Sequence, residues 1–471
     1  MQNESAQHAQ FVKMTTQPVA KLISKLAVPT IISMLVTAIY NMADTYFVSK
    51  LGTSATGAVG IVFSLMAVIQ AVGFTFGMGS GGVISRLLGQ EEHEKANRVA
   101  STAFFMAIFM GLLITVLGLF CMDGLMRILG ATDTILPYAR DYAQYILFGA
   151  PIMGASFVMN NDLRAEGKAV LSMVGITAGG VLNILLDPLF IFVFDMGIAG
   201  AAVATLISQC VSFLILLSNY LLKRSIIRIS IRKVSRESWV YGQILATGMP
   251  SFFRQGLASI ASISLNVNAK LYGDPAVAAM SIVSRVFMLI LSAMLGFGQG
   301  FQPVAGYNFG AKRYDRLKDA FWFCLKVGVA GLFVLSAIGF VLAPQIMSMF
   351  RPDDAEVIAI GSLAFRLQCL SMPLHAVVVV SNMLFQSIGK AKQATFVAVA
   401  RQGLFFLPLI AVLPQTIGLL GVQCSQPIAD VITFASCVPL LTVFFKKLNK
   451  MIPAVPESGN TGNETTTIWE D

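Results

Sequence analysis

Charged side chains are scarce in this sequence. Asp, Glu, Lys and Arg make up 12% of the 471 residues, whereas hydrophobic residues make up 56% and the mean hydropathy is +0.75. Soluble domains usually contain about twice that share of charge. A water-soluble enzyme could not cover its surface with so few charges, and the apolar content excludes a disordered chain apart from its ends. The composition therefore indicates a membrane protein.

Metal-binding and disulfide-forming residues are also few. The six cysteines lie in or beside apolar runs without paired spacing, and His8, His93 and His375 are scattered. This spacing supports neither a disulfide framework nor a zinc site. A membrane-embedded enzyme would need a His/Asp metal set or a nucleophile elbow, and the sequence contains neither pattern. We therefore expect no cofactor and no enzymatic activity.

Twelve apolar runs are long enough to cross a bilayer as helices, which requires about 20 residues each. They lie near 20–48, 55–84, 97–120, 138–160, 170–192, 197–221, 241–271, 276–302, 320–342, 357–385, 395–414 and 417–445. The first run is too long for the hydrophobic region of a signal peptide. The sequence therefore predicts an all-α membrane protein with twelve transmembrane helices.

Lysine and arginine gather on one predicted side of the membrane. The net charge is +9, and 23 of the 33 basic residues lie at the termini and in or beside the even-numbered loops, against five in the odd-numbered loops. Cytoplasmic loops carry such an excess, so both termini and the basic connector 222–240 are predicted to be cytoplasmic. This distribution explains the basic pI as a topology signal, and we expect no nucleic-acid partner.

The chain contains an internal repeat. Prolines, glycines and asparagines recur at a constant offset of 221 or 222 residues: Pro29 and Pro250, Gly52 and Gly273, Gly79 and Gly300, Asn160 and Asn382, Gly167 and Gly389. Chance agreement between apolar runs does not explain such pairs. Because each repeat has six spans, the two lobes keep the same orientation and are related by a pseudo-two-fold axis along the membrane normal. Two such lobes suggest alternating access by analogy of fold.

The repeat divides the chain into predicted segments. They are a cytoplasmic N-terminal segment 1–19, a six-helix lobe 20–221, the connector 222–240, a second six-helix lobe 241–446 and a disordered cytoplasmic tail 447–471.

Ionisable residues inside spans are functional candidates because burying charge in a membrane is costly. Asp44 lies in the first span and Asp187 in the fifth, where Asn183 is four residues earlier and so on the same helix face. With Thr205 in the sixth span they predict a proton or Na⁺ site, since apolar surroundings favour a carboxyl that loads and releases a proton. A polar cluster that only supports helix packing is the alternative.

The second lobe lacks these acids. Leu265 and Leu409 stand at the positions aligned with the two aspartates. Its polar residues within spans are instead Arg254, Arg285, Arg366, Arg401 and Asp430.

Several of these polar residues leave two interpretations open. Arg254 and Arg401 could extend from helix ends to the membrane surface or serve a site. Asp430 either pairs with an arginine, which we expect, or faces a cavity. We take Arg254, Arg285 and Asp430, with Tyr40 and Met66 from the first lobe, as candidates for a substrate cavity or a second polar site. Pro29 interrupts the hydrogen bonding of the first span and predicts a bend there.

Five stretches resemble the multidrug and toxic compound extrusion (MATE) family. They are residues 29–44 (PTIISMLVTAIYNMAD), 160–167 (NNDLRAEG), 183–188 (NILLDP), 197–202 (GIAGAA) and 300–311 (GFQPVAGYNFGA). The first-lobe acids resemble the prokaryotic DinF-type branch. The resemblance implies an antiporter of two six-helix lobes that exports cationic or amphipathic drugs in exchange for H⁺ or Na⁺. We expect it to work as a monomer in the bacterial cytoplasmic (inner) membrane.

The resemblance also implies a first-lobe ion site made by Asp44, Asn160, Asn183, Asp187 and Thr205, with Na⁺ held by Asp44, Asn183 and Asp187 if Na⁺ is the coupling ion. The NorM-type branch has a glutamate in the seventh span. No acid occurs here between Gly248 and Tyr272, which puts a NorM-type site in doubt.

Other classes fit the sequence less well. A lipid-linked sugar flippase of the same superfamily would share the fold, but its cavity is expected to be strongly cationic, whereas the first-lobe cluster here is anionic. The major facilitator class has a basic signature between its second and third spans, and residues 89–95 (GQEEHEK) do not match it. A receptor would not need the duplication.

Overall fold

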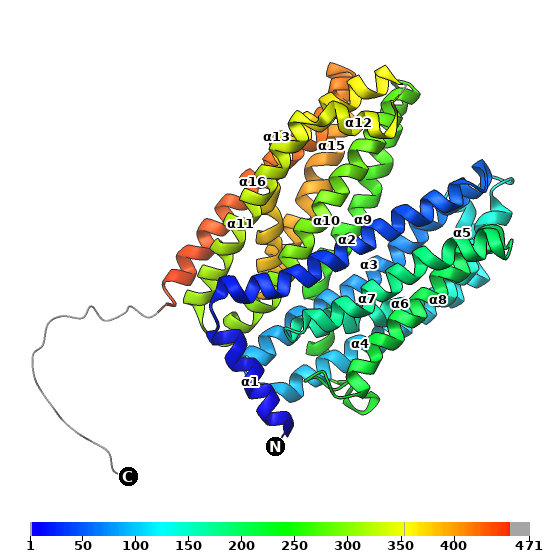
Figure 1. The fold of residues 1–471 in the computed structure, drawn as a ribbon. Coiled ribbons are helices and arrows are strands. Elements are labelled where there is room, and N and C mark those ends of the chain that lie inside the picture. Colours follow the sequence, from blue (N-terminus) through cyan, green and yellow to red (C-terminus); the bar gives the residue numbers. More distant parts are fainter. Residues whose placement is uncertain (1, 353, 453–471) are drawn as a thin grey trace, which may run out of the picture.

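The computed structural model describes residues 2–352 and 354–452, which are almost entirely helical (Figure 1). The first half contains α1 (Gln2–Thr16), α2 (Val19–Ser49), α3 (Thr53–Gly89), α4 (His93–Phe120), α5 (Met122–Ile128), α6 (Leu136–Ala165), α7 (Ala169–Pro188), the π-helix η1 (Leu189–Val193) and α8 (Gly197–Leu221). After the short η2 (Ile231–Lys233), the second half contains α9 (Ser238–Lys270), α10 (Asp274–Gly310), α11 (Tyr314–Val341), α12 (Ala343–Phe350), α13 (Ala355–Ser387), α14 (Ala391–Val399), the π-helix η3 (Ala400–Phe406), α15 (Leu407–Ile417) and α16 (Leu419–Asn449).

Twelve helical spans form two lobes of six, as the sequence predicts. In the described residues, eleven helices are long and apolar enough to cross a membrane, counting α7 with η1 and α14 to α15 as one each. The twelfth span is α9, whose 33 residues are long enough but include polar side chains such as Arg254 and Gln255, which lower its hydropathy. The first lobe contains α2, α3, α4, α6, α7 and α8, and the second contains α9, α10, α11, α13, α14 to α15 and α16.

The repeat is visible in the backbone. The short helices α5 and α12, which the sequence analysis did not predict, begin 221 residues apart. Gly52 precedes α3 with φ of 113°, and Gly273 precedes α10 with φ of 91°. Side chains other than glycine rarely adopt such φ values, and this restriction explains why glycine stands at both copies of the turn.

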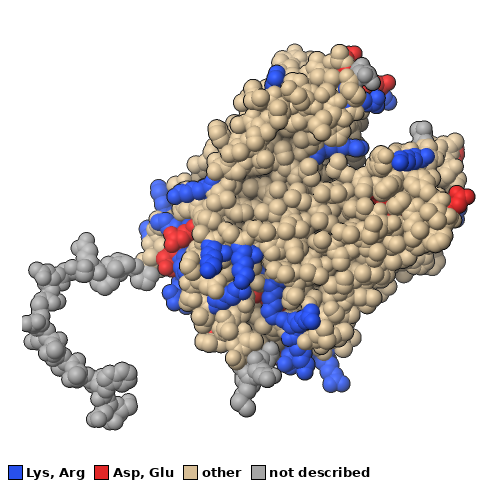
Figure 2. Space-filling model, in the orientation of Figure 1, with Lys and Arg blue, Asp and Glu red and all other residues tan. Residues whose placement is uncertain are grey.

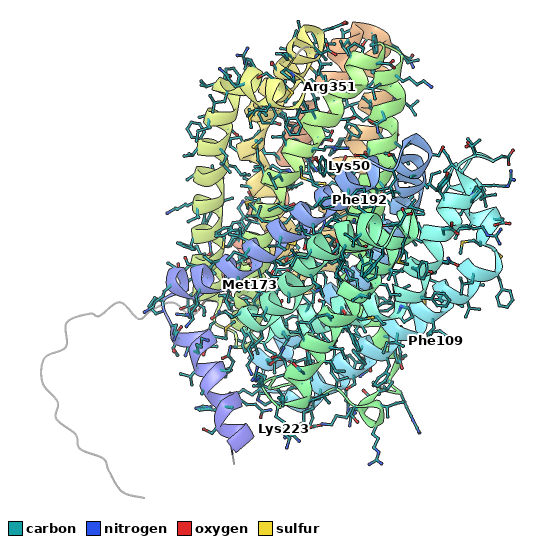
Figure 3. All side chains as sticks on the ribbon, turned by 45° about the vertical axis from the view of Figure 1, so that its right-hand side comes forward. Lys50, Phe109, Met173, Phe192, Lys223 and Arg351 are labelled. Carbon is teal, nitrogen blue, oxygen red and sulfur yellow. The ribbon has the colours of Figure 1, made fainter. Side chains whose placement is uncertain are left out.

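The lobes meet at one side of the molecule and separate toward the other (Figure 1). We call the first the connector side, because α1, residues 222–237 and the end of α16 lie there, and the second the open side. Figure 3 shows Lys223 on the connector side, and Lys50 and Arg351 toward the open side. The surface in Figure 2 is mostly uncharged, with basic side chains gathered near the connector side and a hollow between the lobes.

On the connector side α3 and α10 cross in close backbone contact. A Cβ atom on Gly89 would overlap the carbonyl group of Tyr307, and one on Gly310 would overlap the carbonyl group of Arg86. Both pairs are reciprocal, because Gly310 and Tyr307 stand 221 residues after Gly89 and Arg86. The lobes are therefore closed on this side at a contact that respects the pseudo-two-fold axis.

The connector packs against the first turns of α4. The backbone N–H groups of Arg228, Ser230 and Ser235 donate to the side chains of Asn97, Ser101 and Thr102 at 2.7, 3.1 and 2.9 Å. Because α9 begins at Ser238, the connector is slightly shorter than the predicted 222–240.

The end of the second lobe also differs from the prediction. The tail was predicted to be disordered from residue 447, but α16 continues to Asn449. Residues 453–471 of the predicted tail lie outside the described part of the chain.

Candidate functional site

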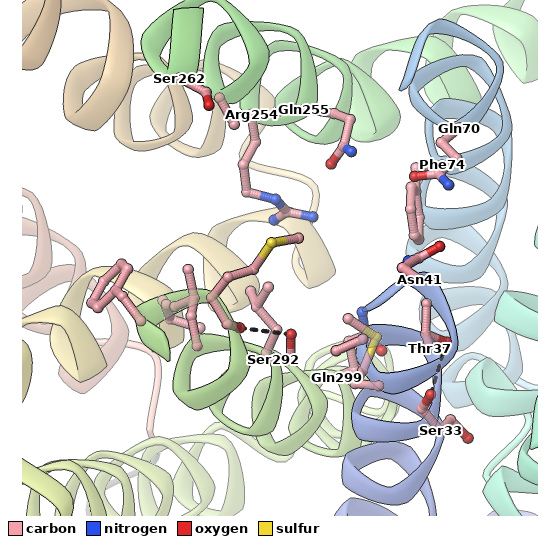
Figure 4. Close-up of a pocket in the computed structure, with 18 of the residues that line it drawn as sticks. Ser33, Thr37, Asn41, Gln70, Phe74, Arg254, Gln255, Ser262, Ser292 and Gln299 are labelled. Carbon is pink, nitrogen blue, oxygen red and sulfur yellow. Dashed lines mark hydrogen bonds between the residues drawn. The ribbon is translucent and has the colours of Figure 1, made fainter. Parts of the chain in front are cut away.

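A cavity of about 460 Å³ lies between the two lobes (Figure 4). Its polar lining includes Ser33, Thr37 and Asn41 of α2 and Gln299 of α10. Its apolar lining is rich in aromatic and methionine side chains from both lobes: Met34, Phe74, Phe157, Met280, Phe287 and Met288. The cavity is therefore amphipathic, with flexible sulfur-containing side chains that adapt to different shapes.

Behind one wall of the cavity, Asp44 and Asp187 lie buried in the first lobe. The hydroxyl of Tyr142 on α6 donates to Asp44 Oδ2 at 3.3 Å. The amide of Asn183 donates to Asp187 Oδ1 at 3.1 Å and lies 3.3 Å from the hydroxyl of Thr205 on α8. Each carboxyl thus has one neutral donor, and its second oxygen has no hydrogen-bond partner in the described residues.

The local sequence of α7 explains how Asp187 is presented. Asn183 and Asp187 are four residues apart, so their side chains share a helix face and can hydrogen bond. Pro188 ends the α-helix and the wider η1 turn follows it. Asp44 lies on α2, which packs directly against α7. The structure therefore brings together Asp44, Asn183, Asp187 and Thr205, as the sequence analysis expected.

The first-lobe cluster offers oxygen atoms to a small cation. Three of them are buried without a partner in the described residues: Asp44 Oδ1, Asn183 Oδ1 and Asp187 Oδ2. Hard cations prefer such oxygen ligands. The searched residues contain no group of three or more His, Cys, Asp or Glu that could hold a transition metal. The cluster suits a proton or an alkali cation.

Asn160 contacts different residues. Its amide donates to the hydroxyl of Ser172 at 2.6 Å and lies 3.4 Å from the Ser172 carbonyl oxygen, tying α6 to α7. Its repeat partner Asn382 donates to the carbonyl of Ala394 at 2.7 Å and ties α13 to α14. Asn160 also lines the cavity, so its predicted part in ion coupling stays a prediction.

Pro29 and Tyr40 lie about three turns apart on α2 and have different surroundings. Pro29 is buried, and the hydroxyl of Ser33 donates to its carbonyl at 3.0 Å. The next residue, Thr30, donates to the carbonyl of Gly296 in the second lobe at 2.6 Å. Tyr40 lines the cavity. The predicted bend at Pro29 stays a prediction.

The candidates Met66 and Arg285 do not line the cavity. Met66 is 4% exposed and belongs to the hydrophobic core of the first lobe. Arg285 is exposed on α10 and does not line the cavity, although its neighbour Ser284 does. One residue along a helix turns the side chain by about 100°. Spacing alone could not show which face of each helix meets the cavity.

The second lobe pairs its buried acid with a base, which confirms the expected pairing of Asp430. Arg401 Nε lies 2.7 Å from Asp430 Oδ1. The amides of Gln368 and Gln426 also donate to this carboxylate, at 2.8 and 3.0 Å. The Arg401 guanidinium lies 5.4 Å from the ring centre of Phe287. The negative charge of Asp430 is thus balanced by Arg401 and stabilised by two amide donors, unlike the two acids of the first lobe.

Some residues of these sites were missed by sequence reasoning. Tyr142 sits in a stretch with three tyrosines, and nothing in their spacing marks the one that faces Asp44. Gln368 and Gln426 are polar residues inside apolar runs, a signal that could have found them. Arg254 is in the middle of α9 and lines the cavity, so it does not extend to the membrane surface from a helix end.

Two repeated six-helix lobes around an amphipathic cavity, with an acidic pair in one lobe, define a membrane transporter with two-fold pseudosymmetry. The sequence pattern of the MatE family matches residues 29–189 and 250–412, once in each lobe. The chain therefore belongs to the MATE family.

Individual relatives agree with this assignment. The multidrug export protein MepA of Staphylococcus saprophyticus subsp. saprophyticus is 28% identical over 419 residues, which cover 89% of this chain and 92% of that protein. An outward-facing structure of a multidrug resistance MATE family transporter has a TM-score of 0.88 and 29% identity, covering 93% of this chain and 98% of that chain. A transporter of the MOP superfamily from Pyrococcus furiosus, described as having a binding pocket of reversed polarity, has a TM-score of 0.87 and 28% identity over 93% and 98% of the chains.

Proposed function

We propose that this chain is a multidrug efflux antiporter that exports amphipathic compounds in exchange for protons. The choice of the proton as coupling ion rests on the surroundings of Asp44 and Asp187. Both are buried, and no cationic side chain pairs with either among the described ion pairs. Buried carboxyls without a counter-charge favour the neutral form, and two neighbouring ones cannot both ionise cheaply. Such a pair takes up and releases a proton as its exposure to water changes.

The cavity supports the substrate class. A volume of about 460 Å³ falls in the range of sites for drug-sized ligands. Its aromatic and methionine lining suits apolar bodies of varied shape, and its amides and hydroxyls suit polar groups. The relative MepA is a multidrug export protein, which agrees with a broad substrate range.

The arrangement of the lobes supports an alternating-access cycle. The basic connector side faces the cytoplasm by the distribution of Lys and Arg, so the structure opens toward the outside of a bacterial cytoplasmic membrane. In this state a proton from outside reaches the acidic pair, and the cavity releases its substrate. Bending of α2 at Pro29 would link the two events. One chain supplies both the cavity and the acids, which supports a monomer as the working unit.

Na⁺ is the second candidate for the coupling ion. The three unpartnered oxygen atoms of the first-lobe cluster favour it, because a small cation could take them as ligands. A proton needs only one of the carboxyls, whereas Na⁺ needs several of these oxygens at once.

The test uses purified protein in proteoliposomes with an imposed pH gradient or, separately, a Na⁺ gradient. Transport of rhodamine 123 and fluorescein, one cationic and one anionic dye, is followed together with the internal pH. We expect Asp44→Asn and Asp187→Asn each to lower proton-driven transport about a hundredfold or more, while the exposed Asp133→Asn leaves it unchanged.

The double variant Asp44→Asn/Asp187→Asn sharpens the test. Two residues of one site give strongly non-additive losses, so the double variant should be no slower than the worse single one. Losses that multiply would show two separate roles. Normal drug-linked proton movement in Asp44→Asn would overturn the proposal, and transport driven by Na⁺ alone would favour the second candidate.

A further inference from the structure

The fixed charges that line the cavity are of one sign. The charged side chains in its lining are Arg164, Arg254 and Arg401, and no aspartate or glutamate of the described residues belongs to it. Asp430 compensates Arg401 at 2.7 Å. The side chains that line the cavity therefore carry a net positive formal charge, although Asp44 and Asp187 lie in the first lobe.

The first-lobe acids do not cancel this charge. Asn183 and Thr205 line the cavity, whereas Asp44 and Asp187 are not part of the lining. In a cycle that protonates them these acids are neutral for part of the time, while an arginine keeps its charge at all physiological pH values. The lasting charge at the cavity is that of the arginines.

Arg164 is held by neighbours at the connector side. Its guanidinium donates to the side chain of Gln299 on α10, which joins the two lobes, and to Asn161 on its own helix α6. Arg401 is engaged by Asp430 and faces the ring of Phe287. Arg164 and Arg401 thus have structural partners, although Nη2 of Arg401 has none among the described residues.

Arg254 differs from both. It lies at the centre of α9, and its one side-chain hydrogen bond in the described residues is a long one, 3.4 Å, to the amide oxygen of Asn382. No described ion pair includes it. Figure 4 shows its guanidinium pointing from α9 into the open space of the cavity, across from Thr37 and Gln299. Most N–H donors of this guanidinium thus have no hydrogen-bond partner among the described residues, and the group is directed at the space a substrate would fill.

We propose that Arg254 binds an anionic group of the substrate, such as a carboxylate, sulfonate or phosphate ester, so that this transporter accepts amphipathic anions. A guanidinium binds planar oxyanions through two parallel hydrogen bonds, and its weak hydration suits an apolar cavity. The neighbouring Met280, Phe287 and Met288 would hold the apolar body of the same molecule. The inference deepens the proposed function, because it assumes that the cavity between the lobes is the substrate site.

The same charge has a second consequence. An arginine that lines the cavity repels cationic compounds, so the preference for anions has an attractive and a repulsive part. Removing Arg254 should therefore weaken anion binding and strengthen cation binding together. A residue that only supported the fold would change both in the same direction.

The test measures binding without any ion gradient, by fluorescence polarisation on the full chain in nanodiscs, with empty nanodiscs as the background. The probes are fluorescein, an anion at pH 8, and rhodamine 123, a cation with the same ring skeleton. The variants are Arg254→Gln, Arg254→Lys and, as matched control, Arg285→Gln, which removes an exposed arginine of α10 outside the cavity. Size-exclusion profiles establish that each variant is folded.

We expect the wild type to prefer fluorescein, and Arg254→Gln to weaken its binding about tenfold to a hundredfold. Arg254→Lys should keep part of the affinity, because the charge remains while the fork is lost. Arg285→Gln should bind as the wild type does. Rhodamine 123 should bind Arg254→Gln at least as well as the wild type.

Two results would overturn the inference. Unchanged fluorescein binding with stronger rhodamine 123 binding would make Arg254 a barrier to cations and not an anion site. Equal weakening of both dyes in folded Arg254→Gln protein would make it structural. Neither result touches proton coupling, which is tested through Asp44. If Asp44→Asn transports normally, the proposed coupling fails while the anion site can still stand.

Discussion

Asp44 in the first lobe and Asp430 in the second are both buried, with 5% and 0% of their surface exposed, but their partners differ. Asp44 accepts one hydrogen bond, from the phenol of Tyr142. Asp430 accepts from the Arg401 guanidinium and from two amides. Burial alone therefore does not distinguish the two carboxyls. The charge of their partners does, because a carboxylate paired with a cation is held ionised.

The difference between Asp44 and Asp430 should have its largest effect on the stability of the protein. Asp430→Asn leaves the Arg401 charge buried without its partner, and we expect a loss of about 3–5 kcal/mol in the free energy of unfolding. Adding Arg401→Gln removes the uncompensated charge and should restore part of the loss. Asp44→Asn, which breaks no ion pair, should lower stability by less than about 1 kcal/mol.

The measurement is the thermal midpoint of the purified variants in one detergent, together with the amount of folded protein in membranes. Equal destabilisation by Asp44→Asn and Asp430→Asn would show that the two acids do not differ as described. Wild-type stability of Asp430→Asn with altered dye selectivity would make Asp430 a substrate residue instead.

Glu166 provides a further buried carboxyl, just beyond the end of α6. Its carboxylate accepts from the hydroxyl of Ser225 and, at 2.8 Å, from the N–H of Ile226, and Lys168 lies at 3.7 Å. Burial raises the pKa of Glu166 from 4.5 to about 7, although Lys168 and these hydrogen bonds act to lower the pKa. It is thus intermediate between the unpaired and the paired acid.

The sign of the pH effect follows from that shift. Between pH 4.5 and 7 the folded protein holds a proton that the unfolded chain releases, so the contribution to stability is full below pH 4.5 and is lost as the pH rises through 7. The wild type should lose up to about 3 kcal/mol over this range, and Glu166→Gln should lose less. Thermal midpoints at pH 5 and pH 8 test this, with the exposed Glu237→Gln as control. An identical pH dependence in Glu166→Gln would contradict it.

The smallest expected effect is a loss of stability at two asparagines, Asn160 and Asn382, which occupy equivalent positions in the two lobes. Asn160 and Asn382 make the same kind of tie between helices, so Asn160→Ala and Asn382→Ala should each cost about 1 kcal/mol of stability. If Asn160 also takes part in coupling, as the sequence analysis predicts, only Asn160→Ala should weaken the pH dependence of dye transport, whereas Asn382→Ala, which removes the acceptor of Arg254 in the cavity, should change dye affinity alone. An equal pH dependence in both variants would restrict Asn160 to the structural tie.

The sequence predicted the fold well because its constraints are local. A transmembrane span can be predicted from the length of its apolar run. A repeated turn can be predicted from glycine at both copies, as at Gly52 and Gly273, where φ is positive. The cluster of Asn183 and Asp187 was predictable for the same reason, since four residues apart on a helix means one face.

The features that the sequence did not predict depend on the rotation of each helix about its axis and on contacts between helices far apart in the sequence. Nothing in the sequence orients α3 so that Met66 enters the core, or α10 so that Arg285 leaves the cavity. The type of partner for Asp430 could be expected from charge balance, but four arginines were available, and packing selects Arg401. Likewise Tyr142 reaches Asp44 from another helix, 98 residues away in sequence.

The reciprocal crossing of Gly89 over Tyr307 and Gly310 over Arg86 has the geometry of an isologous interface between two identical subunits. In a homodimer of six-helix chains every residue would occur twice around that axis, so an aspartate beside the cavity would bring a second one with it. Fusion into one chain removes this rule. It lets one lobe contain Asp44 and the other Leu265 at the aligned position, and it lets Arg254 face the cavity from one side only. A covalent link between the halves thus permits a division of labour that two-fold symmetry would forbid.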